Sequence, residues 1–178
     1  MLIGFAGAKG SGKTTAGNYL QNKGFVLVSF AEPLKKITAE LTGIDIEILN
    51  GETAKTRTQR EIIRDQIWGM TGREALQCIG TEVFRNHFDK DIWIKLAKRK
   101  VMNLLARGKK VCVTDVRFLN EFDMIKMLKG RVVLITRNGT QNNDNHISEI
   151  EYLKFPVEHK IINDHIEDFY KSIDLICK

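Results

Sequence analysis

Near its start the chain reads Gly7-Ala8-Lys9-Gly10-Ser11-Gly12-Lys13-Thr14, a glycine followed by four residues and then Gly-Lys-Thr. The apolar run at residues 2–6 precedes this stretch, and residues 13–22 follow it with a helical pattern. Glycines let a backbone curl so that successive N–H groups face an anion, and the start of a helix adds its positive dipole end. A chance glycine-rich turn would lack these flanks. The stretch therefore predicts a phosphate-binding loop between a strand and a helix.

The loop is expected to bind the phosphates of ATP. The Lys13 side chain can reach the β- and γ-phosphates, and the Thr14 hydroxyl is placed to ligate Mg²⁺. The residues expected to contact the nucleotide are Gly7, Ala8, Gly10, Ser11, Gly12, Lys13, Thr14 and Thr15. Molecular switches, motors and kinases all use such a loop, so the loop alone does not specify a reaction.

Composition places the chain among globular proteins. Its 178 residues are 43% hydrophobic and 28% charged, which suits one domain, residues 1–178, with a substantial core. No apolar run is long enough to span a bilayer, and the first residues lack the basic leader of a signal peptide. Cys78, Cys112 and Cys177 are an odd number without close spacing, which indicates free thiols in a reducing compartment. We therefore expect a cytoplasmic protein with no membrane partner.

Charge favours anionic substrates. Lysine and arginine number 28 against 22 aspartates and glutamates, a net charge of +6. The excess would suit a nucleic-acid partner, but it equally suits an enzyme whose two substrates both carry phosphate. Because the basic residues are spread along the chain and not gathered in one run, we favour small-molecule substrates and expect no nucleic-acid partner.

Strand and helix patterns alternate along the chain. Further apolar runs at 25–28, 111–114, 132–136 and 159–162 read as strands, and helical spacing marks residues 34–41, 76–84, 93–105 and 166–176. This order predicts an α/β fold of three layers, a mostly parallel five-stranded sheet with helices on both faces. Residues 43–72 and 137–149 are polar and show no such pattern. Trp68 and Trp93 stand alone, so we expect them to pack in the core or in a groove and not to stack on bases.

An aspartate follows the predicted strand at 111–114. Ligands collect at the carboxyl ends of parallel strands, so Asp115 is expected to hold Mg²⁺ opposite Thr14. The alternative is that Asp115 caps the next helix.

Two arginines also follow strands. The guanidinium of Arg117 could bind phosphate bidentately, and its alternative is an ion pair with Glu121 or Asp123. Arg137 begins the polar segment 137–149 and could close over the transferring phosphates as part of a lid, or it could be a solvated surface charge.

Five segments, in order along the chain, resemble the bacteriophage-type deoxynucleoside monophosphate kinases, a branch of the P-loop nucleotide kinases. They are the glycine loop, Ser29-Phe30-Ala31-Glu32-Pro33-Leu34-Lys35, Leu76-Gln77-Cys78-Ile79-Gly80-Thr81-Glu82 with Arg85, Asp115-Val116-Arg117-Phe118-Leu119-Asn120-Glu121, and residues 146–149 from His146 through Ser148 to Glu149. Only the first is specific alone, and the others gain weight from their order. The resemblance implies transfer of the γ-phosphoryl group of ATP to a deoxynucleoside monophosphate, with Mg²⁺. These kinases are often dimeric, which is compatible with a homodimer.

The resemblance also implies roles for particular residues. An insert at about 31–85 would bind the acceptor and a lid at about 137–149 would close over it. Lys9 and Lys35 would neutralise the monophosphate, and Lys13, Asp115, Arg117 and Arg137 would serve the transfer. The expected acceptor contacts are Lys9, Leu34, Lys35, Arg64, Gln77, Arg85 and Arg117. Because residues 138–150 contain no arginine, Arg137 and Arg117 would have to supply the lid's charge.

Three other functions stay open at this point. One is a kinase acting on another small molecule, the second is an ATPase associated with nucleic acid, and the third is a nucleotide-dependent switch, for which a second guanine- or effector-reading motif would be expected and is not found. A stripe of interleaved basic and aromatic residues would favour the ATPase, and the sequence contains none. The preferred base of the acceptor cannot be read from the sequence.

Overall fold

A computed structural model describes residues 1–138 and 151–177. The chain forms two compact units. The first, here called the sheet unit, comprises residues 1–30 and 97–178; the second, the helical unit, comprises residues 31–96. Nearly all of the predicted lid, with His146, Ser148 and Glu149, lies outside the described residues.

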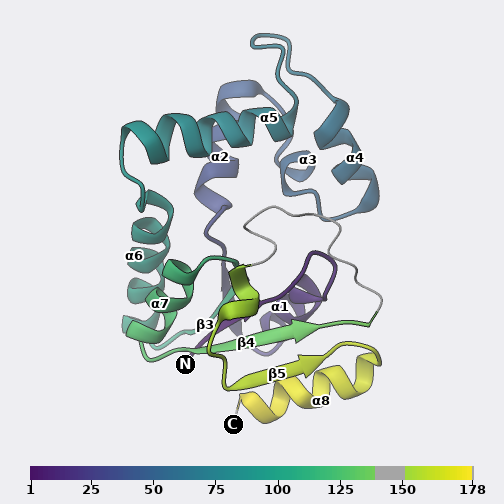
Figure 1. Ribbon diagram of the computed structural model, residues 1–178, viewed down its shortest axis with the longest axis vertical. Helices are drawn as coiled ribbons and strands as arrows, with labels where there is room; N and C mark the ends of the chain where they lie inside the picture. The colour runs from purple at the N-terminus through teal and green to yellow at the C-terminus, as the bar shows by residue number, and fades with distance from the viewer. Residues whose placement is uncertain (139–150, 178) are drawn as a thin grey trace. The chain divides into compact units, whose positions relative to one another are not determined.

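In the described part of the chain, five strands form one parallel sheet in the order β2-β3-β1-β4-β5 (Figure 1). The strands are β1 Leu2–Ala6, β2 Phe25–Val28, β3 Lys110–Val116, β4 Arg131–Thr136 and β5 His159–Ile162. All five predicted strands are therefore present. β3 runs two residues further than expected and includes Asp115.

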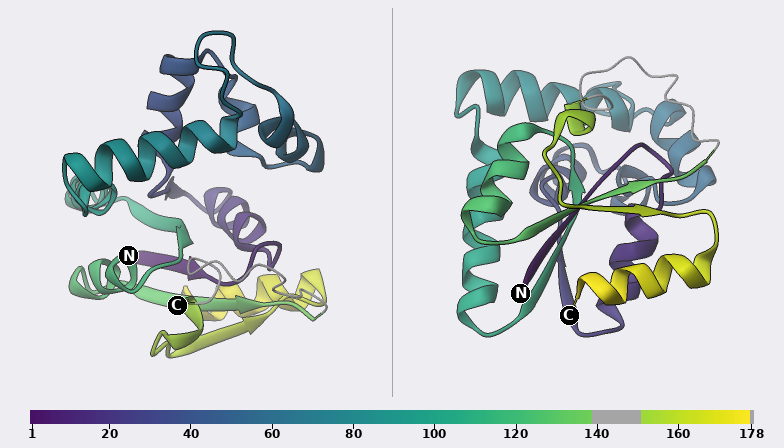
Figure 2. Two further views of the ribbon diagram at one scale, coloured as in Figure 1. Left: turned by 45° about the horizontal axis from the view of Figure 1, so that its top comes forward. Right: turned by 60° about the horizontal axis from the view of Figure 1, so that its bottom comes forward.

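Helices cover both faces of the sheet, which confirms the predicted three-layer α/β fold. One face packs against α1 Lys13–Gln21 and α8 Ile166–Ile176, and the other against α7 Leu119–Met127, with the C-terminal part of α6 Ile92–Ala106 on the same side (Figure 2). The core beneath α1 and α8 is built from large buried side chains on the strands and helices: Ile3, Phe5, Leu20, Val133, Ile135, Phe169 and Ile173. The remaining short helix of this unit is η3 Glu151–Lys154.

The helical unit contains two helices that the sequence did not predict. Its helices are α2 Glu32–Thr42, α3 Ile46–Asn50, α4 Ala54–Ile62, α5 Gly72–Gln77 and η1 Cys78–Arg85. α3 and α4 fall in the polar segment 43–72. Local hydrogen bonds start them, because the Asp45 carboxylate accepts the Glu47 N–H and Thr53 shares a capping box with Thr56.

The helix expected over residues 76–84 changes type along its length. It is α-helical to Gln77 and continues as a π-helix, η1, which is uncommon and often found near functional sites. Gly80 in η1 packs closely on α2, since a Cβ there would lie 2.6 Å from Leu34 Cδ2. The indole of Trp93 is buried and donates to the Gly80 carbonyl at 3.2 Å. Trp68 is 61% exposed and so lies outside the core, although its indole donates to the Leu41 carbonyl at 3.1 Å.

The cysteines are as the sequence predicted. Cys78, Cys112 and Cys177 are free thiols. Burial raises the pKa of the Cys112 thiol well above its ordinary value, so this thiol stays protonated. Among the described helices, none combines the length and the hydropathy needed to cross a bilayer.

A buried aspartate organises the turn before α5. The Asp65 carboxylate accepts backbone N–H groups from Ile67 at 3.0 Å, Met70 at 2.9 Å and Trp68. Burial raises the pKa of this carboxyl, but the N–H groups of Trp68, Met70 and Ile67 outweigh burial, and the net pKa lies below its ordinary value of 3.8. The ionised carboxylate therefore holds the turn together.

We expect Asp65→Asn to lower the melting temperature at neutral pH, because the amide retains one acceptor oxygen for three donors. A carboxyl with a lowered pKa stabilises the fold fully above the ordinary value and loses that contribution as pH falls through the folded-state pKa. The difference in melting temperature between wild type and variant should therefore shrink between pH 5 and pH 3 (about one unit either side of the ordinary value). A difference that does not change over this range would show that the charge of Asp65 has no part in holding the turn.

Candidate active site

The glycine loop links β1 to α1 in a conformation that requires glycine. Gly7 has φ 142° and Gly12 has φ 110°, in the region that side chains disfavour. A Cβ on Gly7 would lie 2.2 Å from the Ile135 carbonyl oxygen of β4. The loop therefore lies directly against the neighbouring strand, and a side chain at position 7 would push it off the sheet.

The Lys13 side chain folds back over the loop. Its Nζ donates to the Gly7 carbonyl at 2.6 Å and to the Ala8 carbonyl at 2.7 Å. These two bonds hold the ammonium beside the loop. This position suits a lysine that contacts phosphates bound in the loop.

Ser11 is the clearest sign of a ligand in the loop. Its side chain is completely buried, and within the described residues its Oγ has no hydrogen-bond partner. Such a hydroxyl costs about 1–3 kcal/mol unless something else completes its bonding. The first N–H groups of α1 also lack helical partners, as in every helix. A phosphate oxygen would satisfy both, so the loop fits the phosphates of a nucleotide.

Asp115 ties the ends of two strands together. Its Oδ2 accepts the Ser29 hydroxyl at 2.6 Å and its Oδ1 accepts the Phe30 N–H at 2.9 Å. Ser29 and Phe30 follow β2 and are the last residues of the first segment of the sheet unit. Each carboxylate oxygen can accept a further bond, so a cation ligand role is compatible with these contacts. The sequence did not single out Ser29 as a partner of Asp115.

A buried glutamate fixes the backbone at Arg117. Glu121 is 4% exposed, and its Oε2 accepts the N–H of Arg117 at 2.8 Å and that of Phe118 at 3.1 Å. These two bonds satisfy donors at the start of α7 and hold the segment that carries Arg117. The sequence placed Glu121 only as a possible ion-pair partner of Arg117, so its contact with the backbone is an addition from the structure.

The other predicted residues divide between the two units. In the sheet unit, Lys9 and Thr14 are exposed at the loop and the start of α1, Thr15 lies in the first turn of α1, and Arg137 is exposed directly after β4. In the helical unit, Leu34 and Lys35 lie on α2, Gln77 ends α5 and Arg85 ends η1. The predicted acceptor contacts therefore do not come from one unit alone.

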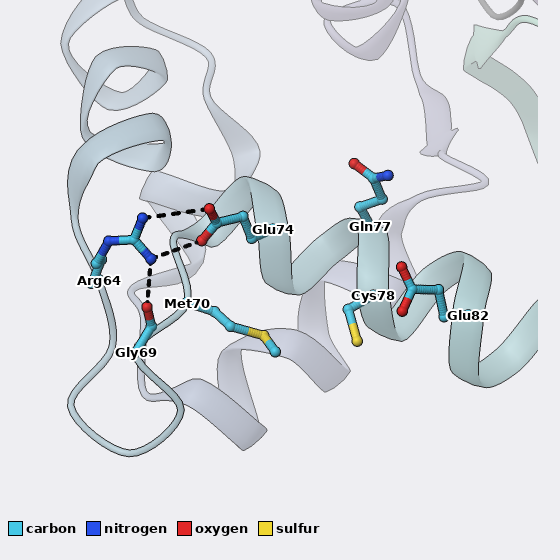
Figure 3. Close-up of a pocket in the computed structure, with 7 residues that line it drawn as sticks. All are labelled: Arg64, Gly69, Met70, Glu74, Gln77, Cys78 and Glu82. Carbon is cyan, nitrogen blue, oxygen red and sulfur yellow. Dashed lines mark hydrogen bonds and ion pairs between the residues drawn. The ribbon is translucent and has the colours of Figure 1, made fainter.

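The helical unit contains a cavity of about 380 Å³ lined by Arg64 and Gln77 (Figure 3). Its other lining residues are Gly69, Met70, Glu74, Cys78 and Glu82. Arg64 already has partners, since it donates to the Gly69 carbonyl at 2.6 Å and to Glu74 Oε2 at 3.0 Å. The Thr71 N–H, and more weakly Arg64, lower the pKa of the Glu74 carboxyl. In this conformation Arg64 therefore braces the turn before α5.

Comparisons with known proteins point to one family. A family model described as deoxynucleotide monophosphate kinase matches residues 42–173. A protein of Acanthamoeba polyphaga mimivirus, provisionally named a deoxynucleotide monophosphate kinase, is 39% identical over 186 residues. The match covers 97% of this chain and 94% of the mimivirus protein. The deoxynucleotide monophosphate kinase of Escherichia phage RB69 is 31% identical over 111 residues, which cover 60% of this chain but only 44% of the phage protein.

A solved structure supports the fold independently. The crystal structure of TT1252 from Thermus thermophilus superposes with a TM-score of 0.56 at 15% sequence identity, covering 99% of this chain and 95% of that one. The resemblance that five ordered segments of the sequence suggested is confirmed by the family model and by the mimivirus relative. The chain belongs to the deoxynucleotide monophosphate kinase family.

Proposed function

We propose that this protein transfers the γ-phosphoryl group of ATP to a deoxynucleoside monophosphate, giving the deoxynucleoside diphosphate and ADP. An oxygen of the acceptor's phosphate forms a bond to the γ-phosphorus as the bond from that phosphorus to the ADP oxygen breaks. The single observation that carries the ATP site is the fully buried Ser11 hydroxyl, with no partner among residues 1–138 and 151–177, in a loop where Lys13 is already held.

Catalysis of such a transfer depends mainly on the positioning of the two substrates and on positive charge near the phosphates, because the protein need not form a covalent intermediate. The loop N–H groups and Lys13 would hold the β- and γ-phosphates. The side chain of Arg117 would offset the negative charge that develops on the transferring group, and Glu121 holds the backbone of Arg117 in place. Arg137 would contribute a second positive charge.

The proposed Mg²⁺ would depend on ATP for most of its ligands. Among the described residues, no group of three or more histidine, cysteine, aspartate or glutamate side chains could hold a metal ion. Mg²⁺ commonly keeps few protein ligands and is completed by substrate phosphates and water. Thr14 and Asp115 are the protein residues proposed for it, and it would supply charge neutralisation to the phosphates.

The acceptor is proposed to bind with residues of the helical unit. Lys35 on α2 and Arg85 on η1 supply cations there, while Gln77 offers an amide that can both donate and accept. Leu34, which packs on Gly80, supplies apolar contact, and Arg64 could join the acceptor if it left Glu74. Lys9 and Arg117 are likewise proposed as contacts of the acceptor.

The test is an ADP-release assay with each of the four deoxynucleoside monophosphates and their ribonucleotide counterparts. We expect slow release with ATP alone and at least about tenfold faster release with one or more monophosphates, since a kinase transfers to its acceptor in preference to water. Stimulation by single- or double-stranded nucleic acid, with none by any monophosphate, would instead identify an ATPase associated with nucleic acid.

Two substitutions extend the same assay to the acceptor site. Lys35→Ala and Arg117→Ala should raise the KM for the monophosphate by about 10- to 100-fold and the KM for ATP much less, as expected for lost contacts to a charged group. Arg117→Ala should also lower turnover. Equal, small effects on both constants would mean that neither side chain contacts the acceptor.

A further inference from the structure

A residue far along the chain is bonded to the glycine loop. Asn163, directly after β5, lies with its side-chain Nδ2 2.9 Å from the Ser11 carbonyl oxygen, 152 positions away in sequence. Its own backbone N–H donates to the Thr136 carbonyl at 2.8 Å, which anchors it to the end of β4. Asn163 is therefore held on the sheet and reaches across to the loop.

The direction of this hydrogen bond is fixed by its partners. A carbonyl oxygen can only accept, so the amide must present its NH₂ group to Ser11. The same nitrogen lies beside Gly12, where a Cβ would come within 2.2 Å of it. Gly12 is thus required by its φ of 110° and also by the side chain of Asn163.

This bond determines which way one peptide group points. Ser11 C=O and Gly12 N–H belong to the same planar, trans peptide, so they point in opposite directions. With the carbonyl drawn toward Asn163, the Gly12 N–H must point away from Asn163. Within the described residues no acceptor engages that N–H. Gly12 directly precedes Lys13, the first residue of α1, and lies in the part of the loop expected to hold phosphate.

We propose that Asn163 is a positioning residue that locks the Ser11–Gly12 peptide with its N–H directed at the bound phosphates. Without the bond this peptide could flip, because glycine tolerates both orientations, and a flipped peptide would present a carbonyl oxygen to an anion. Lys13 restrains the carbonyls of Gly7 and Ala8 in the same loop, so Asn163 supplies the restraint that Lys13 does not. The inference rests on the proposed ATP site.

The experiment measures binding without any acceptor. ATP and tripolyphosphate, which has no base or sugar, are titrated calorimetrically into wild type, Asn163→Leu and Asn163→Asp. Leucine keeps the approximate size and removes the donor, and aspartate keeps the shape but replaces the donor by an acceptor. Asn103→Leu, at an exposed position on α6, is the matched control.

We expect Asn163→Leu to weaken ATP and tripolyphosphate to the same extent, by about 10-fold, and Asn163→Asp by about 100-fold, while Asn103→Leu changes neither. In parallel, the Gly12 amide proton signal should shift strongly when ATP binds wild type and little when it binds Asn163→Leu. In turnover, KM for ATP should rise while KM for the acceptor stays constant.

Each contrary outcome has a distinct meaning. If tripolyphosphate affinity is unchanged and only ATP is weakened, Asn163 contacts the base or sugar and the proposal is wrong. The proposal also fails if the Gly12 signal shifts equally in wild type and Asn163→Leu. Failure of wild type itself to bind either ligand would instead overturn the ATP site on which the proposed function depends.

Discussion

Replacing Lys13 by methionine is expected to lower turnover by about a thousandfold or more while leaving the fold intact. The ammonium lies 2.6 Å from the Gly7 carbonyl and 2.7 Å from the Ala8 carbonyl, so a small shift would carry it to a phosphate bound in the loop. Methionine keeps a long unbranched side chain and removes the charge. Turnover and the thermal melt followed by circular dichroism, measured on the same preparation, test both parts.

Lys109→Met provides the control, because Lys109 is an exposed lysine directly before β3. It should retain wild-type turnover and show that loss of one positive charge from a chain of net charge +6 has no general effect. A folded Lys13→Met protein with near-normal turnover would remove the glycine loop from the proposed mechanism.

The central strands of the sheet could be predicted from the sequence because they are buried on both faces. β1 and the middle of β4 are continuous runs of apolar residues, so their existence and nearly their ends can be read from the apolar pattern alone. The short helices α3 and α4 could not be predicted in this way, since side-chain caps start them and α4 buries no residue. The π-helix η1 was also missed, because a change in backbone hydrogen bonding leaves the apolar pattern nearly unaltered.

The site residues also differ in how far they could be predicted from the sequence. Gly7 to Thr14 are neighbours in sequence, so their spacing alone predicted the loop and the role of Lys13. Ser29 acts on Asp115 from 86 positions away, and Asn163 acts on Ser11 from 152. Only the order of the strands in the sheet brings such pairs together. A single sequence contains no local signal for them.

Asp115→Asn is expected to lower turnover by about a hundredfold and to weaken the apparent affinity for Mg²⁺. The amide can still accept the Phe30 N–H through its oxygen and donate to the Ser29 hydroxyl, so the tie between β3 and the end of β2 is largely preserved. The free energy of unfolding should therefore change by no more than about 1 kcal/mol. What the variant loses is the negative charge beside the proposed phosphates.

Ser29→Ala separates the two roles of Asp115. It removes one donor to the carboxylate and leaves the charge, so a metal role for Asp115 predicts a much smaller loss of turnover than in Asp115→Asn and a nearly normal Mg²⁺ dependence. Turnover measured over a range of Mg²⁺ concentrations at fixed ATP, with thermal melts of all three proteins, gives the comparison. If both variants lose turnover equally and both keep the wild-type Mg²⁺ dependence, Asp115 acts by holding the segment after β2, and the metal role falls.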